Sequence, residues 1–167
     1  MTLLEEIEVE KIIISKQGEI SENYQEFLKL IKQKNANVIV VEKGDRIFIE
    51  KGVCFDILWP QKKQIQENIL NNNSIVAKLN YNDFSMLFTG DIEEIAEEKI
   101  LKEIDSKVLK SDVLKVAHHG SKSSSTQDFI KTVNPKIALI GVGENNTFGH
   151  PNEEVVERLK NLRSTNF

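Results

Sequence analysis

Cysteine and long apolar runs are almost absent from this sequence. Cys54 is the single cysteine among 167 residues, which excludes an internal disulfide and any zinc site built from several cysteines. No apolar run approaches the roughly 20 residues that cross a bilayer, and the acidic residues 1–10 do not form a signal peptide. We therefore expect the sequence as written to be a soluble, cytoplasmic protein.

Positively charged residues are fewer than negatively charged ones. The 22 lysines and arginines face 26 aspartates and glutamates, a net charge of −4, which argues against a sequence-independent nucleic-acid coat with a basic face. An enzyme that acts on phosphodiesters stays open, because a local basic patch or metal ions can meet the phosphate. Hydrophobic residues at 40% and charged residues at 29% are ordinary for a globular protein, and the length predicts one domain covering residues 1–167.

The first half of the chain predicts short strands around one helix. Strands are expected at residues 9–15, 37–42, 45–50 and 53–59. A helix is expected at residues 21–33, where Ser21 can cap it. Lys43 and Gly44 predict a tight turn that joins the strands on either side as a hairpin. The polar residues 61–73 predict a loop.

The second half predicts strands that alternate with helices. Strands are expected at residues 74–81, 84–89, 113–117 and 136–142, and helices at residues 93–104, 125–133 and 153–162. Alternation of this kind indicates an α/β layered arrangement, while the hairpins of the first half keep the sheet mixed.

Residues that suit metal chemistry follow two of these strands. Asp91 comes after an apolar strand and a glycine, so it is either the N-cap of the next helix or a carboxylate that bridges metal ions. His118 and His119 end another strand, and neutral imidazole is both the commonest nitrogen ligand of zinc and a proton carrier. If the backbone stays extended, the two rings point to opposite faces, and only one faces a site unless the chain turns at Gly120.

His150 is the remaining histidine and lies in a Gly-His-Pro sequence after the last predicted strand. It belongs either to a helix-entry turn or to a ligand set, and Pro151 restricts it to extended geometry. The carboxyl ends of strands in an α/β sheet converge on one crevice. Because potential metal ligands follow three separate strands, we expect one shared site for Asp91, the histidine pair and His150.

Other polar residues near these positions have two interpretations each. Asn73 and Ser74 end a polar run that is typical of a solvated loop. Ser121 begins a run of hydroxyls that Ser125 explains as a helix cap, and no Gly-x-Ser-x-Gly nucleophile elbow is present. Lysines near the histidines are either scattered surface charge or contacts for a polyanionic substrate: Lys115, Lys122, Lys131 and Lys136.

Five blocks of sequence occur in the order of a known family. They are residues 73–76, 87–93, 114–121, 134–136 and 149–152. Together they resemble the metallo-β-lactamase-fold hydrolase domain of ComEC-type bacterial competence (DNA-uptake) proteins, over nearly the whole chain. The resemblance implies a four-layer αββα sandwich with two mixed sheets and a di-metal centre, zinc or manganese. It also implies hydrolysis of a phosphodiester, with single-stranded DNA as one possible substrate.

The resemblance gives roles to individual residues. It implies Asp91 as the bridging carboxylate and His150 as the late histidine ligand. It implies His118 and His119 as a ligand or a proton donor. The residues expected to contact the substrate are Asn73, Ser74, Lys115 and Ser121.

The family's first metal motif, His-x-Asp-x-Asp-His, has no counterpart here, since no histidine precedes His118. We expect a domain that is truncated at its N-terminus and shortened after Leu162, with an impaired metal site. Missing strands would leave a sheet edge exposed and favour self-association. The family's domain is usually membrane-attached or extracytoplasmic, unlike this sequence as written.

Two functions of different classes follow from these observations. The first is a metal-dependent hydrolase of the nuclease or phosphodiesterase type, with a small nucleotide or other phosphoester as a further substrate class. The second is a non-catalytic module that uses the same fold for binding or assembly.

Overall fold

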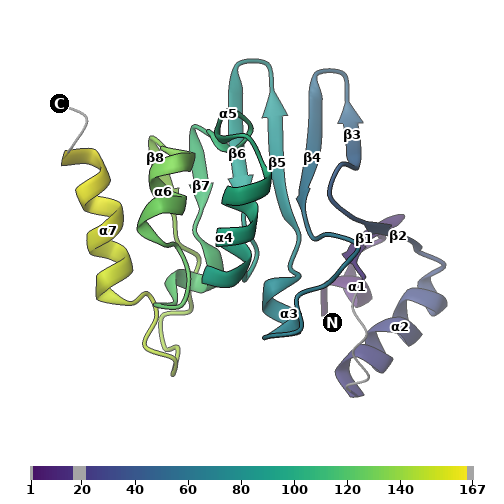
Figure 1. The fold of residues 1–167 in the computed structure, drawn as a ribbon. Coiled ribbons are helices and arrows are strands. Elements are labelled where there is room, and N and C mark those ends of the chain that lie inside the picture. The colour runs from purple at the N-terminus through teal and green to yellow at the C-terminus, as the bar shows by residue number, and fades with distance from the viewer. Residues whose placement is uncertain (1, 17–21, 165–167) are drawn as a thin grey trace. The chain divides into compact units, whose positions relative to one another are not determined.

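A computed structural model describes residues 2–16 and 22–164 of the chain. The chain divides into two compact units, Met1–Val41 and Glu42–Phe167, and each is described by itself (Figure 1). The single domain expected from the length stays a prediction.

The first unit is a parallel strand pair with two helices. Its elements are α1 (Thr2–Glu6), β1 (Lys11–Ser15), α2 (Glu22–Lys34) and β2 (Asn37–Val41). The strands β1 and β2 pair in parallel, and the Asn37 N–H donates to the Glu10 carbonyl at 2.8 Å just before the ladder. Helix α2 lies between them in sequence, as a parallel connection requires. The cap predicted at Ser21 lies outside the described residues.

The hairpin predicted around Lys43 and Gly44 is wrong, although the turn exists. The Asp45 N–H donates to the Glu42 carbonyl at 3.1 Å, and the Asp45 carboxylate accepts from the Glu42 N–H at 2.8 Å. The strands on either side belong to different sheets, since β2 pairs with β1 and β3 pairs with β4. Turn chemistry alone therefore predicted the reversal correctly and the pairing incorrectly.

The second unit is built on a six-stranded mixed sheet in the order β3-β4-β5-β6-β7-β8. Its strands are β3 (Arg46–Glu50), β4 (Val53–Trp59), β5 (Val76–Tyr81), β6 (Phe84–Phe88), β7 (Val113–Lys115) and β8 (Ile137–Leu139). The pairs from β3 to β6 are antiparallel, and those from β6 to β8 are parallel. The α/β class with mixed sheets is confirmed. A sandwich of two sheets stays a prediction.

The second unit also contains helical segments between and after the strands. They are α3 (Ile69–Asn72), α4 (Glu94–Glu103), α5 (Ser106–Leu109), the 3-10 helix η1 (Ala117–Gly120), α6 (Gln127–Val133) and α7 (Glu153–Ser164). Figure 1 shows α4 and α6 in front of the strands β6 to β8. Leu87 and Leu114, neighbours across β6 and β7, share one core with Ile100 of α4, Phe129 of α6 and Val155 of α7.

The loop predicted at residues 61–73 is partly wrong. It contains the short helix α3, and Asn72 and Asn73 are fully buried instead of solvated. The Asn72 carbonyl accepts from the indole N–H of the fully buried Trp59 at 2.7 Å. A polar composition misled the prediction because these amides satisfy buried backbone groups.

Parallel pairing places the carboxyl ends of β6, β7 and β8 at one edge of the sheet, the lower one in Figure 1. Asp91 follows β6, the histidine pair follows β7, and His150 follows β8. None of the helices within residues 2–16 and 22–164 has the length and apolarity that a membrane span requires.

Candidate functional site

The loop after β6 is closed by Gly90, which has a left-handed backbone with φ of 54°. A Cβ at this position would lie 2.7 Å from the Ser74 Cβ, so only glycine lets the two loops approach. The Gly90 carbonyl accepts from the His118 N–H at 3.0 Å, which joins this loop to the histidine pair. The N-cap of α4 is Glu93 rather than Asp91. The capping role considered for Asp91 is therefore wrong, and its side chain is left for the site.

The chain turns at the histidines themselves. His118 and His119 both have left-handed backbones, with φ of 46° and 53°, so the extended geometry considered for the pair does not occur. Gly120 follows with φ of 80°, and a Cβ there would lie 2.8 Å from the Pro151 Cβ. Its carbonyl accepts from the Asn152 N–H at 2.9 Å. Three loops that are distant in sequence are thereby tied into one edge.

His118, His150 and Glu93 form what we call the inner cluster. The His118 and His150 rings meet edge to face with centroids 5.9 Å apart. The His118 Nδ1 lies 3.4 Å from a Glu93 carboxylate oxygen, within reach of a charge interaction but without a hydrogen bond. In the described part of the chain, the buried Nδ1 atoms of both rings have no hydrogen-bond partner. Buried imidazole nitrogens normally have one, so these two are ready to accept a further ligand.

His119 and Asp91 form the outer pair. The His119 Nδ1 lies 2.6 Å from the Gly141 carbonyl, and its Nε2 lies 3.9 Å from an Asp91 carboxylate oxygen. Since a carbonyl can only accept, Nδ1 carries a proton in this contact, and in the neutral form of the ring the lone pair is then on Nε2. The side chains are 51% and 46% exposed. A backbone carbonyl that orients a metal-ligating histidine in this way is common in proteins.

Glu93 is the residue that the sequence analysis missed. One carboxylate oxygen accepts from the Ser123 hydroxyl at 3.1 Å and the other from the Asn68 amide at 2.6 Å. Its N–H donates to the Asn72 side chain at 3.0 Å. In the sequence, Glu93 is only the first residue of the helix expected at residues 93–104. Its position two residues after Asp91, on the same strand end, was the available sequence signal.

The residues predicted to contact substrate have unequal positions. Asn73 is fully buried, and its amide bonds the backbone of Ile65 and Ile69, so it holds the segment before β5 and exposes no atom to a substrate. Ser74 lies against Gly90. The Lys115 ammonium donates to the Val116 carbonyl at 3.0 Å.

The serine-rich loop after the histidines is anchored by a buried acid. Glu97 of α4 is fully buried, and its two carboxylate oxygens accept from the N–H groups of Ser125 at 2.5 Å and Thr126 at 2.8 Å. Burial raises the pKa of Glu97, against the lowering effect of these bonds and of Arg158. Ser121 begins this loop and is 7% exposed, and its hydroxyl lies 3.1 Å from that of Ser123.

The helix cap predicted at Ser125 is wrong. The N-cap of α6 is Thr126, and Ser125 has a left-handed backbone with φ of 56°. Its N–H is taken by Glu97, so the serine run is organised from α4 rather than from its own helix.

The donor types at this edge suit a divalent cation. Imidazole nitrogen and carboxylate oxygen are the usual protein ligands of zinc, and both inner Nδ1 atoms lack a partner. The set is not closed, however. Across residues 2–16 and 22–164, no three histidine, cysteine, aspartate or glutamate side chains are grouped closely enough to hold an ion.

Comparison with characterised proteins finds homology over most of the chain. ComE operon protein 3 of Bacillus subtilis is 33% identical over 159 residues, which are 95% of this chain and 20% of that protein. Competence protein ComA of Neisseria gonorrhoeae is 34% identical over 110 residues, 65% of this chain and 15% of that protein. The chain therefore spans about one fifth of the first relative and less of the second.

One solved structure supports the α/β fold, and a second aligns more loosely. A Parabacteroides distasonis protein, provisionally named a metal-dependent hydrolase, aligns with a TM-score of 0.51 and 12% identity over 94% of this chain and 74% of that one. The metallo-β-lactamase fold protein YhfI of Bacillus subtilis aligns with a TM-score of 0.46 and 10% identity over 91% of this chain and 59% of that one. No protein-family profile matches the chain. Over most of its length, the chain is homologous to one segment of ComE operon protein 3 and related competence proteins, and it has an α/β fold with mixed sheets that is similar to that of the Parabacteroides distasonis protein.

Proposed function

We propose that this chain is a metal-dependent hydrolase domain of the competence-protein type, which cleaves phosphodiester bonds such as those of single-stranded DNA. The observation that carries the proposal is the meeting of the inner cluster and the outer pair at one sheet edge. Gly90 and Gly120 make the close contacts that join their loops. Homology to competence proteins supports DNA as the polymer involved.

Asp91, His118 and His150 are the proposed cation ligands. His119 is the alternative to His118 as a ligand, because its Nε2 lies 3.9 Å from an Asp91 oxygen and its other nitrogen is held by Gly141. A divalent ion, zinc or manganese, supplies Lewis acidity that makes water nucleophilic near neutral pH. Whichever of His118 and His119 is not a ligand is placed to carry a proton.

The substrate-contacting part of the proposal falls on Lys115, Ser74 and Ser121. Lys115 supplies positive charge at the carboxyl end of β7, next to the histidines. Ser74 and Ser121 offer hydroxyls beside Gly90 and Gly120. We leave Asn73 out of this group, since its amide is used by the backbone.

Isothermal titration with zinc and with manganese tests the cation part of the proposal, and hydrolysis of an oligonucleotide and of a small chromogenic phosphodiester tests the activity. We expect weak binding and slow, metal-dependent turnover, because the described ligands do not form a closed group. Turnover should disappear in Asp91→Asn. A wild-type chain that binds neither metal, or turnover that survives in Asp91→Asn, would contradict the proposal.

A second candidate is a non-catalytic binding or assembly module. It is favoured by the lack of a closed three-ligand group among the residues that the structure describes. This candidate predicts that saturating metal produces no hydrolysis of any phosphodiester or phosphomonoester, although the fold is intact. The titration and the activity assay together distinguish the two.

A further inference from the structure

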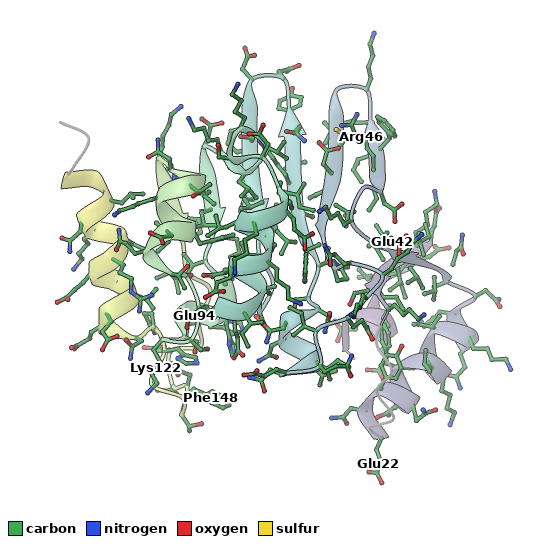
Figure 2. The ribbon with its side chains drawn as sticks, in the orientation of Figure 1. Glu22, Glu42, Arg46, Glu94, Lys122 and Phe148 are labelled. Carbon is green, nitrogen blue, oxygen red and sulfur yellow. The ribbon has the colours of Figure 1, made fainter. Side chains whose placement is uncertain are left out.

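Phe148 stands out among the apolar side chains near the candidate site. It is 80% exposed, the highest value among the large hydrophobic residues that the structure describes. It lies in the loop between β8 and α7, two residues before His150. Figure 2 shows Phe148 and Lys122 projecting from the lower edge of the second unit, at the carboxyl ends of the parallel strands. Single exposed apolar side chains are common on protein surfaces, so what distinguishes Phe148 is its position beside the candidate site.

The loop that carries Phe148 is braced. The Asn146 side chain accepts from the His150 N–H at 3.0 Å and donates to the His150 carbonyl at 2.8 Å, which closes residues 146–150 into a ring. The same amide donates to the Gly143 carbonyl at 3.1 Å. Phe148 is therefore presented from a defined turn that is pinned at both ends.

One face of the Phe148 ring is already engaged. The Phe148 and His150 rings are stacked, with centroids 6.0 Å apart and an interplanar angle of 18°. Offset stacking of aromatic rings spans about 4.5–7 Å between centroids. An aromatic ring that is stacked on one side and 80% exposed leaves its other face to solvent. That face is the right size and shape for one more planar ring.

We propose that Phe148 is the stacking platform for a nucleobase of a single-stranded nucleic acid whose backbone lies at the candidate hydrolytic site. The inference rests on the proposed function, because it names the substrate class of that site. A base that stacks on Phe148 extends the column that begins at His150. The neighbouring phosphodiester is thereby held next to the proposed ligands.

The local charge favours a base over a phosphate at this ring. Glu144 is exposed in the same loop, and the whole chain carries a net charge of −4. The Glu144 carboxylate disfavours a phosphate in this loop but does not repel an uncharged base, so we assign the ring to the base and the phosphate to the loop that carries Lys122. Lys122 is exposed and lies two residues after Gly120. The Gly120 carbonyl accepts from the Asn152 N–H, which ties the loop of Lys122 to the end of the loop that carries Phe148. Lys122 is therefore the cation that can contact a phosphate of the nucleic acid. Base stacking is tolerant of sequence, so the platform predicts little base preference.

Binding of two fluorescent oligomers to the metal-free full chain tests the proposal. One is a short oligothymidylate, and the other is an abasic oligomer with the same number of phosphates. We expect Phe148→Ala to weaken binding of the oligothymidylate by roughly fivefold or more and to leave the abasic oligomer unchanged. Phe148→Trp should keep or tighten the binding of the oligothymidylate.

A matched control is available on the same unit. Phe48 on β3 is 72% exposed and lies on the opposite edge strand of the sheet from β8. Phe48→Ala removes the same ring from the surface and should change neither affinity. Circular dichroism of all variants establishes that the fold is kept.

Several results would overturn the inference. They are equal affinity of the wild type for both oligomers, an oligothymidylate affinity that is unchanged by Phe148→Ala, and equal weakening of both oligomers by that variant. Vesicle binding that depends on Phe148, without base dependence, would assign the ring to a membrane surface instead. Metal-dependent hydrolysis without Phe148-dependent base binding would refute only this inference. Base binding without hydrolysis would refute only the proposed function.

Discussion

The inner cluster and the outer pair use the same residue types but differ in how they are held. His118, His150 and Glu93 are partly or largely buried, and His118 contacts both of the others; among the described residues, the Nδ1 atoms of the two histidines have no hydrogen-bond partner. His119 and Asp91 are about half exposed, and the His119 Nδ1 is occupied by the Gly141 carbonyl. The inner cluster is thus ordered by packing, and the outer pair by a single backbone contact.

This difference separates two requirements of a metal site. A ligand needs a free lone pair, and it needs a partner that fixes the ring. The outer histidine has both, with Nε2 toward Asp91 and Nδ1 on Gly141. Within the described part of the chain, the Nδ1 atoms of the inner histidines have no hydrogen-bond partner, and a Glu93 oxygen lies 3.4 Å from that of His118. A cation that drew both groups together would need His118 and His119 to share it from adjacent positions.

The largest expected effect is the loss of both groups at once, which Gly120→Ala should cause. Gly120 has φ of 80°, and a Cβ would lie 2.8 Å from the Pro151 Cβ. Alanine therefore adds backbone strain and a clash that the rigid proline ring cannot relieve. We expect a loss of about 1–3 kcal/mol from strain alone, together with loss of zinc binding. Urea unfolding and isothermal titration measure the two.

Gly143→Ala is the matched control for that variant. A Cβ at Gly143 meets nothing within 4 Å, and its φ lies outside the left-handed region. Its stability and metal binding should match the wild type. If Gly120→Ala has the same stability and metal binding as Gly143→Ala, the close contact between Gly120 and Pro151 is not what joins the two histidine loops.

The next effect concerns the inner cluster alone, because it weakens the serine loop that contacts Glu93. Glu97 holds the N–H groups of Ser125 and Thr126, and the same serine loop supplies the Ser123 hydroxyl to Glu93. Glu97→Ala leaves the buried Ser125 N–H without a partner, which costs about 1–3 kcal/mol. Glu98→Gln, at an exposed neighbouring acid, should cost less than about 0.5 kcal/mol. Urea unfolding of both variants checks the contrast.

The same acid predicts a pH dependence of stability. Burial raises the pKa of Glu97 above the ordinary 4.5, so the folded state binds this proton more tightly than the unfolded state. Its contribution is fully present below the ordinary pKa and is lost as the pH rises through the folded-state pKa. Glu97→Gln does not titrate, so its stability should fall less than that of the wild type from about pH 5 to about pH 8. Parallel pH slopes for the two proteins would contradict this reasoning.

The sequence predicted the strands better than the contacts between side chains. Val53–Trp59 was predicted with its observed bounds, because a β-branched and aromatic run ends at a proline. The alternating pattern predicted the α/β arrangement, and in the structure the parallel strands β6, β7 and β8 bring Asp91, the histidine pair and His150 to one edge. What local patterns cannot give is which backbone group a polar side chain satisfies. The sequence therefore predicts Asn73 as part of a loop and Ser125 as a cap, and it gives no role to Glu93, although Ser125 and Glu93 have partners about 30 residues away.

The smallest expected effect distinguishes the two groups most directly. Glu93→Gln keeps the shape of the side chain but removes the carboxylate charge 3.4 Å from the His118 Nδ1. We expect the nitrogen-15 shifts of the His118 ring to change in the metal-free protein, and zinc affinity to fall by about tenfold. The His119 ring shifts should stay as they are, because the Gly141 carbonyl sets its tautomer independently of Glu93. Equal shift changes at both rings would mean that the inner cluster and the outer pair behave as one unit. Unchanged thermal unfolding of the variant would show that the shift and affinity changes do not come from a loss of the fold.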